Sequence, residues 1–336
     1  MRTEQADPRI SVIIVNWNGL SLLEECLRSL EGQTFRDFEI IMVDNGSSDG
    51  SAEWVRRNYP KVRLLELGFN TGFSAGNNAG LKIARGEFIA LLNNDTKTDP
   101  GWLEALYSCI RSDPNIAACD SMILYYDQPH LIWSSGGSYT VAGSVFARLN
   151  REPNIGSERI PVDVFIAVAC AALYRKKVID EIGFFDEDFF NGYEDVDWSF
   201  RAHLSGYRIV NQPRALIYHK VSSTQVHNSP EFVYNGQRNV SAVFIKNMPP
   251  PLHFIYGPFH LAYILGSCLY FARTGQLRAF LRAKKDLVRM LPVLWQKRKS
   301  IQSKRLLGPR EVDRLLDKRW LGAKARKFGN KDHGTS

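Results

Sequence analysis

The chain has 336 residues, of which 44% are hydrophobic and 12% are aromatic. This composition can build one large or two ordinary cores, so disorder is excluded for most of the sequence. The five cysteines are scattered and never spaced as CxxC, which excludes a disulfide framework and a zinc-thiolate site and indicates a reducing compartment. The first ten residues show no secretory signal peptide, so we expect a cytoplasmic protein.

Basic residues are concentrated toward the C-terminal end of the sequence. Residues 246–336 contain 20 Lys and Arg against 5 Asp and Glu, whereas the rest of the chain contains 23 against 30. The net charge of +8 therefore combines an acidic body with a basic final section. No recognised nucleic-acid-binding module accompanies the basic residues, so we expect no nucleic-acid partner.

The first hundred residues alternate between β-branched apolar runs and segments of helical spacing. This alternation predicts a βαβα arrangement with a parallel sheet. The predicted strands are 10–15, 39–43, 62–67 and 88–92, and the predicted helices are 20–30, 51–58 and 70–84. Ligands in such sheets bind beyond the carboxyl ends of the strands. Polar clusters follow three of these ends, at 16–19, 44–50 and 93–95, so we expect the chemistry there.

The middle of the chain is less regular. Residues 102–161 show no clear period, and they receive no secondary-structure assignment beyond loop composition at 134–137 and 150–157. An ordered block follows over 162–218. It contains a predicted helix at 194–204, ended by Gly206, and a predicted strand at 207–219, interrupted at Pro213.

The basic section begins with an apolar segment. Residues 247–272 contain no charged side chain and are long enough to span a membrane, although Pro258 and two glycines make an interfacial helix at least as good a prediction. Residues 277–295 then carry an apolar stripe beside basic residues, which is typical of a helix lying on an anionic membrane surface. The alternative is a helix packed on the protein's own core. The charge asymmetry favours the membrane surface.

Two strand-end carboxylates are candidates for cation chemistry. Asp95 stands where phosphates could approach, and Mg²⁺ or Mn²⁺ typically bridges one or two carboxylates to substrate phosphates. Asp44 lies at an equivalent strand end. Aspartate at the end of a strand is also common as a turn former or a helix cap. The sequence contains neither GxxxxGK[ST] nor a GxGxxG after the first strand, which argues against P-loop and NAD chemistry.

Five motifs occur in a fixed order and carry a resemblance to a known family. They are IVNWNG (14–19), VDNGSSDG (43–50), NTGFSAGNN (70–78), LLNNDT (91–96) and FFDEDFFNGYEDVDW (184–198). Together they resemble the GT-A, family 2 inverting glycosyltransferases, and most of all the rhamnosyltransferase branch. The resemblance covers about residues 10–239, with Arg238 and Asn239 as its last element.

The resemblance implies an α/β GT-A fold, in which a Rossmann-like nucleotide-binding sheet merges with an acceptor-binding half. We expect a glycosyltransferase domain over 8–245, divided into a nucleotide-sugar half (8–120) and an acceptor and catalytic half (121–245). A basic helical membrane-association region follows over 246–325. Residues 326–336 are expected to form a disordered tail.

The resemblance also implies roles for the donor-side residues. Asp44 would contact the nucleotide base or ribose, and the turn of Val15, Asn16 and Trp17 would shape that pocket together with Asn78. Asp95 would be the final acid of a DxD-type motif and would hold Mg²⁺ or Mn²⁺ on the diphosphate. Asn93 and Asn94 stand in the first two positions of that motif, and a neutral amide binds a cation less strongly than a carboxylate does.

The catalytic side follows from the same resemblance. Glu194 and Asp195 match the family's ED motif, with Asp195 as the general base of an inverting transfer. Without the family, the two acids would be interpreted as residues that favour a helix N-terminus. His219 would complete the metal site, and Trp198 would border the sugar or the acceptor. The alternatives are a structural histidine and a core tryptophan.

The predicted reaction is transfer of L-rhamnose from dTDP-rhamnose, with UDP-sugars as other possible donors, to a glycan or polyprenyl-linked acceptor. The predicted place is the inner face of the cell membrane, with the chain bound peripherally to the anionic surface. Two alternatives belong to other classes. One is a catalytically silent glycan-binding or scaffold protein on the same fold, and the other is a basic membrane adaptor.

Overall fold

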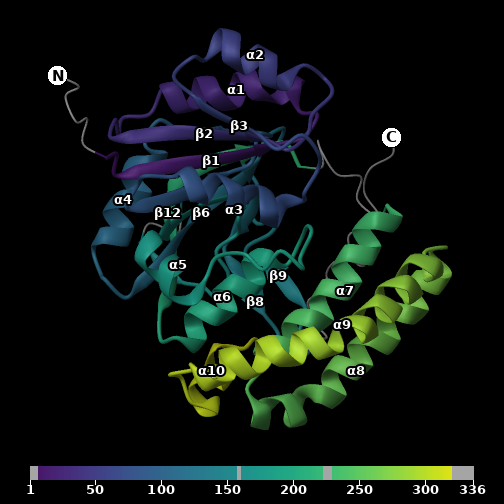
Figure 1. The fold of residues 1–336 in the computed structure, drawn as a ribbon. Helices are drawn as coiled ribbons and strands as arrows, with labels where there is room; N and C mark the ends of the chain where they lie inside the picture. Colours follow the sequence, from purple (N-terminus) through teal and green to yellow (C-terminus); the bar gives the residue numbers. More distant parts are fainter. Residues whose placement is uncertain (1–6, 157–159, 222–228, 320–336) are drawn as a thin grey trace.

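A mixed sheet forms the centre of the computed structural model, which describes residues 7–156, 160–221 and 229–319 (Figure 1). In that part of the chain the sheet has ten strands, in the order β10-β12-β6-β11-β4-β1-β2-β3, with β5 beside β12 and β7 beside β6. Its strands are β1 (Ile10–Asn16), β2 (Phe38–Asp44), β3 (Arg63–Glu66), β4 (Phe88–Leu92), β5 (Thr96–Thr98), β6 (Ile116–Tyr125), β7 (Ile132–Ser135), β10 (Val162–Asp163), β11 (Ala171–Arg175) and β12 (Arg208–His219). A separate ribbon pairs β8 (Gly137–Tyr139) with β9 (Val145–Ala147).

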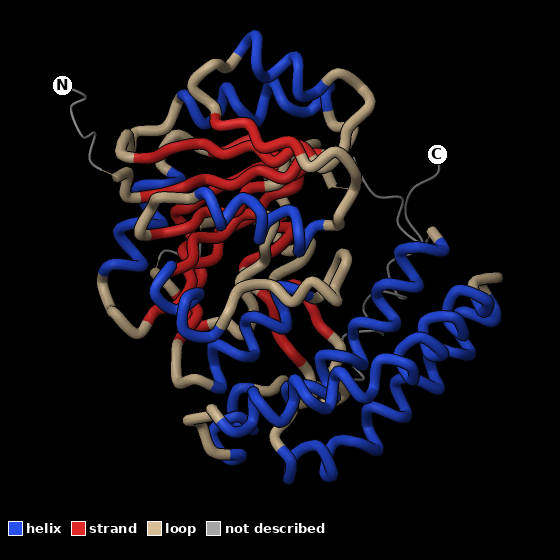
Figure 2. Tube along the Cα trace, in the orientation of Figure 1, coloured by secondary structure: helices blue, strands red, loops and turns tan. Residues whose placement is uncertain are grey.

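Helices cover both faces of the sheet, because successive strand residues point to opposite sides (Figure 2). Val12 and Ile14 of β1 pack with one set of helices, whereas Ile13 packs with the other set. The first set is α1 (Leu20–Glu31), α2 (Ser51–Asn58) and α4 (Trp102–Arg111). The second set is α3 (Phe73–Ile83), α5 (Lys176–Ile182) and α6 (Glu194–Leu204). The outcome is a three-layer α/β unit with buried parallel strands at its centre.

The predicted elements of the first hundred residues are confirmed. The four predicted strands are β1 to β4, and β1 pairs in parallel with both β2 and β4, as β2 does with β3. Helix α3 begins at Phe73 rather than at residue 70, because Gly72 has a φ of 88° and cannot belong to a right-handed helix. The helix predicted at 194–204 matches α6 residue for residue.

The middle of the chain contributes the elements that the sequence left unassigned. β6 is almost wholly buried between β11, which runs antiparallel to it, and β12, which runs parallel. β12 continues through Pro213, but its register with β6 shifts between Gln212 and Leu216. Proline cannot donate a ladder hydrogen bond, and the shift accommodates it.

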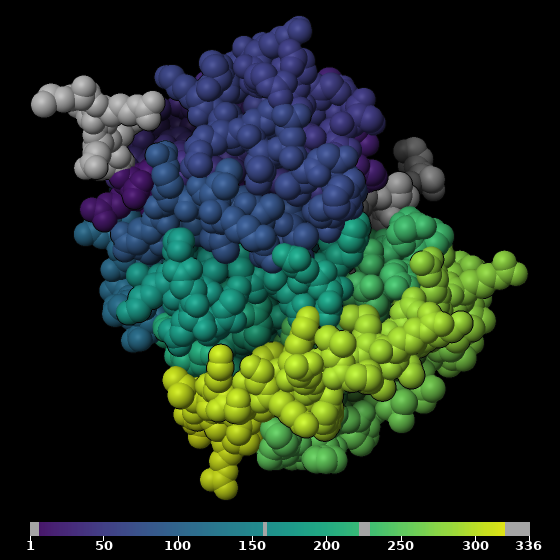
Figure 3. Space-filling view, viewed as in Figure 1, coloured from purple at the N-terminus to yellow at the C-terminus, as the bar shows by residue number. Residues whose placement is uncertain are grey.

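Four helices form the C-terminal end: α7 (Pro230–Asn247), α8 (Pro250–Arg273), α9 (Leu277–Ser303) and α10 (Pro309–Leu315). The domain boundary expected between 245 and 246 falls inside α7. Residues from all four helices share a hydrophobic core with Phe189, in the loop before α6, and with Phe200 of α6. Figure 3 shows the yellow-green helices packed directly against the teal middle of the chain. The predicted tail, 326–336, lies outside the described residues.

Helix α8 is the one helix in the described part of the chain that is long and apolar enough to cross a membrane. Its most apolar 18-residue window has a mean hydropathy of 1.3, and only 11% of that window is buried. Helix α9 has two faces. Phe280, Leu287 and Leu294 are buried, whereas the residues that follow each of them, Leu281, Val288 and Trp295, are exposed. Packing on the protein's own core therefore accounts for one apolar face of α9 and leaves the other open.

Candidate active site

The carboxyl ends of β1, β2 and β4 are tied together by side chains. Asn16 and Asp44 are neighbours in the register of β1 and β2. The buried Asn16 Oδ1 accepts a hydrogen bond from Asn94 Nδ2 (2.7 Å), and Asn16 Nδ2 donates to Ser47 Oγ (3.2 Å). Gly19 is needed here, because a Cβ would lie 2.3 Å from Asn94 Nδ2. Three of the polar clusters expected at the strand ends thus form one connected edge.

Asp44 presents an unused acceptor at this edge. Its Oδ2 accepts from the backbone N–H of Ser47 at 3.0 Å. Its Oδ1 is buried and finds no hydrogen-bond partner in the described part of the chain. A buried acceptor without a partner is costly, so it indicates a donor supplied by a ligand, such as a ribose hydroxyl or a base N–H. Val15 lies against Gly76 of α3, and Trp17 is 48% exposed beside the edge.

Asn78 lies on α3, and its side chain binds the loop before α6. Its Nδ2 donates to Phe185 O (2.9 Å) and to Glu187 Oε1 (3.0 Å). The amide therefore fixes the loop before α6, and only its buried Oδ1, which has no partner among the described residues, is left for a ligand. Sequence reasoning missed Asn45, whose side chain holds the turn before α3 by bonds to Asn70 and Thr71.

Asp95 and His219 lie together at the opposite side of β4. His219 Nε2 is 3.2 Å from Asp95 Oδ1, and both side chains are nearly buried. The pair lacks hydrogen-bond geometry, and Asp95 Oδ1 has no hydrogen-bond partner within the described residues. Adjacent ligands of an octahedral ion bound at about 2.1 Å are about 3 Å apart, so this spacing matches two neighbouring ligand positions, although the described part of the chain contains no group of three His, Cys, Asp or Glu side chains placed to hold a metal ion.

The two asparagines before Asp95 have different positions. Asn94 is buried, and its amide is used in the bond to Asn16. Asn93 is partly exposed, and its side chain makes no hydrogen bond within the segments that the structure describes, while its backbone N–H donates to Cys170 O at 2.8 Å. Of the two, Asn93 is the one that is free to meet a cation or a phosphate.

Glu194 and Asp195 begin α6 after a left-handed turn. Gly192 and Tyr193 have φ values of 80° and 73°, and the second is a strained conformation for a non-glycine residue. Asn239 Nδ2 holds this turn by donating to Asn191 O (3.2 Å) and Gly192 O (2.7 Å). The turn therefore places both acids at the start of the helix.

The two carboxyl groups differ in environment. Asp195 accepts hydrogen bonds from the backbone N–H groups of Ala169 (3.2 Å) and Val196 (2.8 Å), although burial raises its pKa. Burial, and then the charge of Asp195, raise the pKa of Glu194 to about 8, and Glu194 Oε2 has no partner in the described residues. Both carboxyl groups therefore release their protons less readily than exposed acids do, and a pKa of about 8 leaves Glu194 largely protonated at neutral pH.

Asp120 is a further acid that sequence reasoning missed. It lies in β6, is wholly buried, and accepts from Val168 N and Asn211 Nδ2, both at 2.8 Å. Burial, with a lesser contribution from the charge of Asp195, raises its pKa to about 8. The thiol pKa of the buried Cys170 is raised by burial and then by Asp95, Asp120 and Asp195. Acids from three elements thus surround Cys170, and no motif marked the one in β6.

Trp198 corrects an expectation. Its side chain is wholly buried in the core below α6, with its ring centroid 4.9 Å from that of Tyr174 and its Nε1 donating to Gly183 O at 3.1 Å. Every residue of α6 from Val196 to Leu204 is buried, so this part of the helix offers Trp198 no exposed side. Trp198 therefore does not border a sugar or an acceptor, and the alternative of a core tryptophan holds.

Comparison with known sequences identifies the family of this arrangement. The profile of Glycosyl transferase family 2 matches residues 11–183. An N-acetylglucosaminyl-diphospho-decaprenol L-rhamnosyltransferase of Mycobacterium tuberculosis is 29% identical over 241 residues, which cover 64% of this chain and 77% of that protein. An uncharacterised glycosyltransferase of Bacillus subtilis is 29% identical over 227 residues, which cover 66% and 78%.

Solved structures with the same fold are more distant in sequence. GalNAc-T7 with UDP, GalNAc and Mn²⁺ superposes with a TM-score of 0.57 at 17% identity, covering 71% of this chain and 48% of that one. A mannosyltransferase of Pyrobaculum calidifontis with GDP-Man and Mn²⁺ gives 0.54 at 18% identity, covering 89% and 84%. The expected GT-A-like α/β fold with a C-terminal helical region is confirmed.

Proposed function

Because this chain belongs to glycosyl transferase family 2, we propose that it is an inverting enzyme that transfers a sugar from a nucleotide donor to a membrane-linked acceptor. The observation that carries the proposal is the adjacent carboxyl groups of Glu194 and Asp195 at the start of α6, with Asp195 held by two backbone N–H groups, together with the separate Asp95–His219 pair. The first supplies a base and the second a place for a cation. A scaffold without activity has no need of either.

In the proposed reaction Asp195 accepts the proton of the acceptor hydroxyl. The oxygen attacks the anomeric carbon from the face opposite the leaving group, and the bond between that carbon and the diphosphate oxygen breaks. The donated backbone N–H bonds from Ala169 and Val196 fix the direction of the Asp195 carboxylate. Glu194, held neutral, limits the negative charge next to the base.

Asp95 and His219 would hold a divalent cation, Mg²⁺ or Mn²⁺, with Asn93 beside them. When bound, such a cation neutralises negative charge on the departing nucleoside diphosphate. Two related folds were solved with Mn²⁺. The protein's own part is to keep the unpaired oxygen of Asp95 and the ring nitrogen of His219 at adjacent ligand positions.

For the donor we propose dTDP-rhamnose, with a UDP-sugar as the other candidate. Asp44, with its unpaired buried oxygen, would read the base or ribose, and Asn16 and the exposed Trp17 would flank it. The L-rhamnosyltransferase named above supports rhamnose and a diphospholipid acceptor, at 29% identity. We place the reaction at the inner face of the cell membrane, where the exposed apolar residues of α8 and the open face of α9 would contact lipid.

Calorimetry of donor nucleotides tests this proposal. The full chain is titrated with dTDP, UDP and GDP, with and without Mn²⁺, as the wild type, as Asp95→Ala and as Asp127→Ala, which removes an exposed acid. We expect Mn²⁺-dependent binding of one nucleotide to the wild type and to the Asp127 variant, with loss in Asp95→Ala. A folded wild type that binds none of the three would overturn the proposal.

A further inference from the structure

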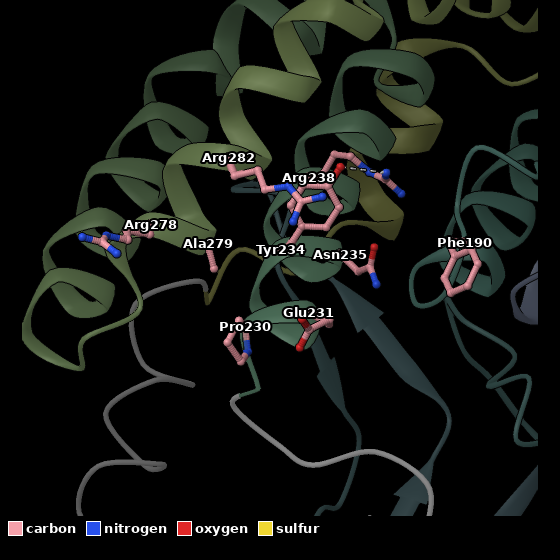
Figure 4. A pocket seen from close by; sticks show the side chains of 9 residues that line it. All are labelled: Phe190, Pro230, Glu231, Tyr234, Asn235, Arg238, Arg278, Ala279 and Arg282. Carbon is pink, nitrogen blue, oxygen red and sulfur yellow. Dashed lines mark hydrogen bonds between the residues drawn. The ribbon is translucent and has the colours of Figure 1, made fainter. Parts of the chain in front are cut away.

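A cavity of about 530 Å³ opens between the first turns of α7 and α9 (Figure 4). Its charged lining is Arg238, Arg278, Arg282 and Glu231, so it carries an excess of two positive charges. Tyr234 from α7 and Phe190 from the loop before α6 supply aromatic surface. Neither Asp44 nor Asp95 lines it, so the cavity is separate from the proposed donor site.

The three arginines have no carboxylate partner. In the described part of the chain no Asp or Glu oxygen lies within ion-pair distance of any of them, whereas Lys246 and Lys297 of the same helical layer each bind two. Arg282 lies over the Tyr234 ring at 4.7 Å, and Arg238 approaches the same ring at 5.2 Å. Figure 4 shows Tyr234 between the two guanidinium groups. The three guanidinium nitrogens of Arg238 donate to Asn239, Tyr234 and Asp188. Arg278 and Arg282 make no hydrogen bond within the described residues, and guanidinium groups of this kind are suited to bidentate pairing with phosphate oxygens.

The cavity adjoins the loop that leads to the acidic pair. Phe190 stands four residues before Glu194, and its carbonyl oxygen accepts from Phe73 N at 2.7 Å. Arg238 Nη2 donates to Asp188 O at 2.9 Å in the same loop. A ligand held by the arginines would therefore lie along the segment that positions Asp195.

The cavity also lies at the end of the helical layer where α8 meets α9. Helix α8 ends at Arg273, and α9 begins at Leu277, one residue before Arg278 (Figure 1). Along α8 the side chains of Leu261, Leu265 and Leu269 repeat every four residues and are more than half exposed. An apolar chain leaving the cavity could continue over this surface.

We propose that this arginine cavity binds the diphosphate of a lipid-linked acceptor. The guanidinium groups of Arg278 and Arg282 pair with phosphate oxygens, and the lipid leaves along the exposed residues of α8. The inference rests on the proposed function, since it names the class of acceptor for the same reaction. The shared chemistry is a phosphoryl anion, and the lipid chain is what distinguishes this acceptor from free diphosphate and from membrane phospholipid.

Binding of farnesyl diphosphate to the full chain tests the proposal. Calorimetry compares the wild type with Arg278→Ala/Arg282→Ala and with Lys299→Ala/Lys304→Ala, which removes the same charge from the far end of α9. We expect the arginine variant to bind farnesyl diphosphate at least about tenfold more weakly, because charge-assisted hydrogen bonds are lost. The lysine variant should match the wild type, and binding of dTDP with Mn²⁺ should be unchanged in both.

Five results would overturn the assignment. If farnesyl diphosphate does not bind the wild type, or if it binds the arginine variant equally well, the cavity is not the binding site. If inorganic diphosphate binds as tightly as farnesyl diphosphate, the lipid chain contributes nothing to binding and the ligand is not a lipid-linked acceptor. Phosphatidylglycerol vesicles that need the two arginines while farnesyl diphosphate does not bind indicate a membrane contact. Loss of dTDP binding in the arginine variant assigns the cavity to the donor. Nucleotide binding by the wild type, measured in the same series, tests the proposed function separately.

Discussion

Lys246 Nζ lies 2.8 Å from Asp197 Oδ1, and both side chains are almost wholly buried. Lys246 also reaches Asp186 Oδ2 at 2.5 Å, so one lysine of α7 joins α6 to the loop before it. Lys297 of α9 binds Asp186 and Asp188 from the other side. The segment that carries Glu194 and Asp195 is thus fixed by charges from the C-terminal helices.

Removing that lysine should be costly. Lys246→Met removes an ion-pair partner from the buried carboxylate of Asp197 and from Asp186. Removing one partner of a buried ion pair lowers the free energy of unfolding by about 3–5 kcal/mol. Urea denaturation measures it. Lys285→Met, an exposed position on α9, should change the free energy by less than about 0.5 kcal/mol. A loss below about 1 kcal/mol in Lys246→Met would contradict a structural role for the pair.

Deleting the last helices should destabilise the whole chain. A chain that ends at residue 249 loses Leu287, Leu294 and Val312, which share a core with Phe189 and Phe200. Exposed aromatic surface next to the acidic pair should lower the melting temperature by more than about 10 °C or cause aggregation. Differential scanning fluorimetry and gel filtration would show this. If the truncated chain had the same melting temperature as the full-length chain, α8 to α10 would form an independent unit.

Glu194 should make stability depend on pH. In the folded protein its pKa of about 8 lies above the ordinary value of 4.5. The contribution of Glu194 to the free energy of unfolding is therefore complete below about pH 4.5 and is lost as the pH rises through 8. Glu194→Gln cannot ionise. Its melting temperature relative to the wild type should therefore rise between about pH 5 and about pH 8.5. Exposed Glu104→Gln should show no such trend, and a constant difference for Glu194→Gln would refute the raised pKa.

Gly19 tests the connected strand-end edge. Gly19→Ala places a Cβ 2.3 Å from Asn94 Nδ2 and 2.5 Å from Asn16 Oδ1, so the bond between these amides must shift. We expect a loss of about 1–3 kcal/mol in stability and at least about tenfold weaker nucleotide binding. Gly32→Ala, whose Cβ would meet only ordinary contacts, should bind nucleotide like the wild type. Equal binding by both variants would separate this edge from the donor site.

Membrane contact is tested on α8. Leu261→Glu/Leu265→Glu places two charges on its exposed face and should reduce co-sedimentation with phosphatidylglycerol vesicles at least about tenfold. Leu306→Glu, at a residue 75% exposed outside α8, is the control and should sediment like the wild type. Vesicle binding that is equal in all three proteins would exclude α8 as the contact surface.

Periodicity and turn chemistry predicted β1 to β4, α1 to α3 and α6, because each has a strong local pattern. They could not predict β6, whose buried residues include Asp120 and Ser121 and show no alternation. Packing on both faces by neighbours distant in the sequence, rather than local preference, makes it a strand.

The candidate site also divides into residues that the sequence indicated and residues that it did not. The motifs contain Asp44, Asp95, Glu194 and Asp195, and the resemblance added His219, which the structure brings to Asp95 although 124 positions separate them. Burial and the backbone donors Ala169 and Val196, which set the environment of Asp195, have no sequence signature, and neither has the buried Asp120. The prediction for Trp198 was wrong because α6 is buried on all sides from Val196 onward, which its spacing from Asp195 does not reveal.

The most direct test of the account is the rate of nucleoside diphosphate release from dTDP-rhamnose, and from a UDP-hexose, by the wild type, Asp195→Asn and Glu194→Gln. The account predicts a loss of at least about 10²-fold in Asp195→Asn with unchanged dTDP affinity in Mn²⁺, and a smaller loss in Glu194→Gln. Release by Asp195→Asn within about threefold of an active wild type would contradict the assignment of Asp195 as the base.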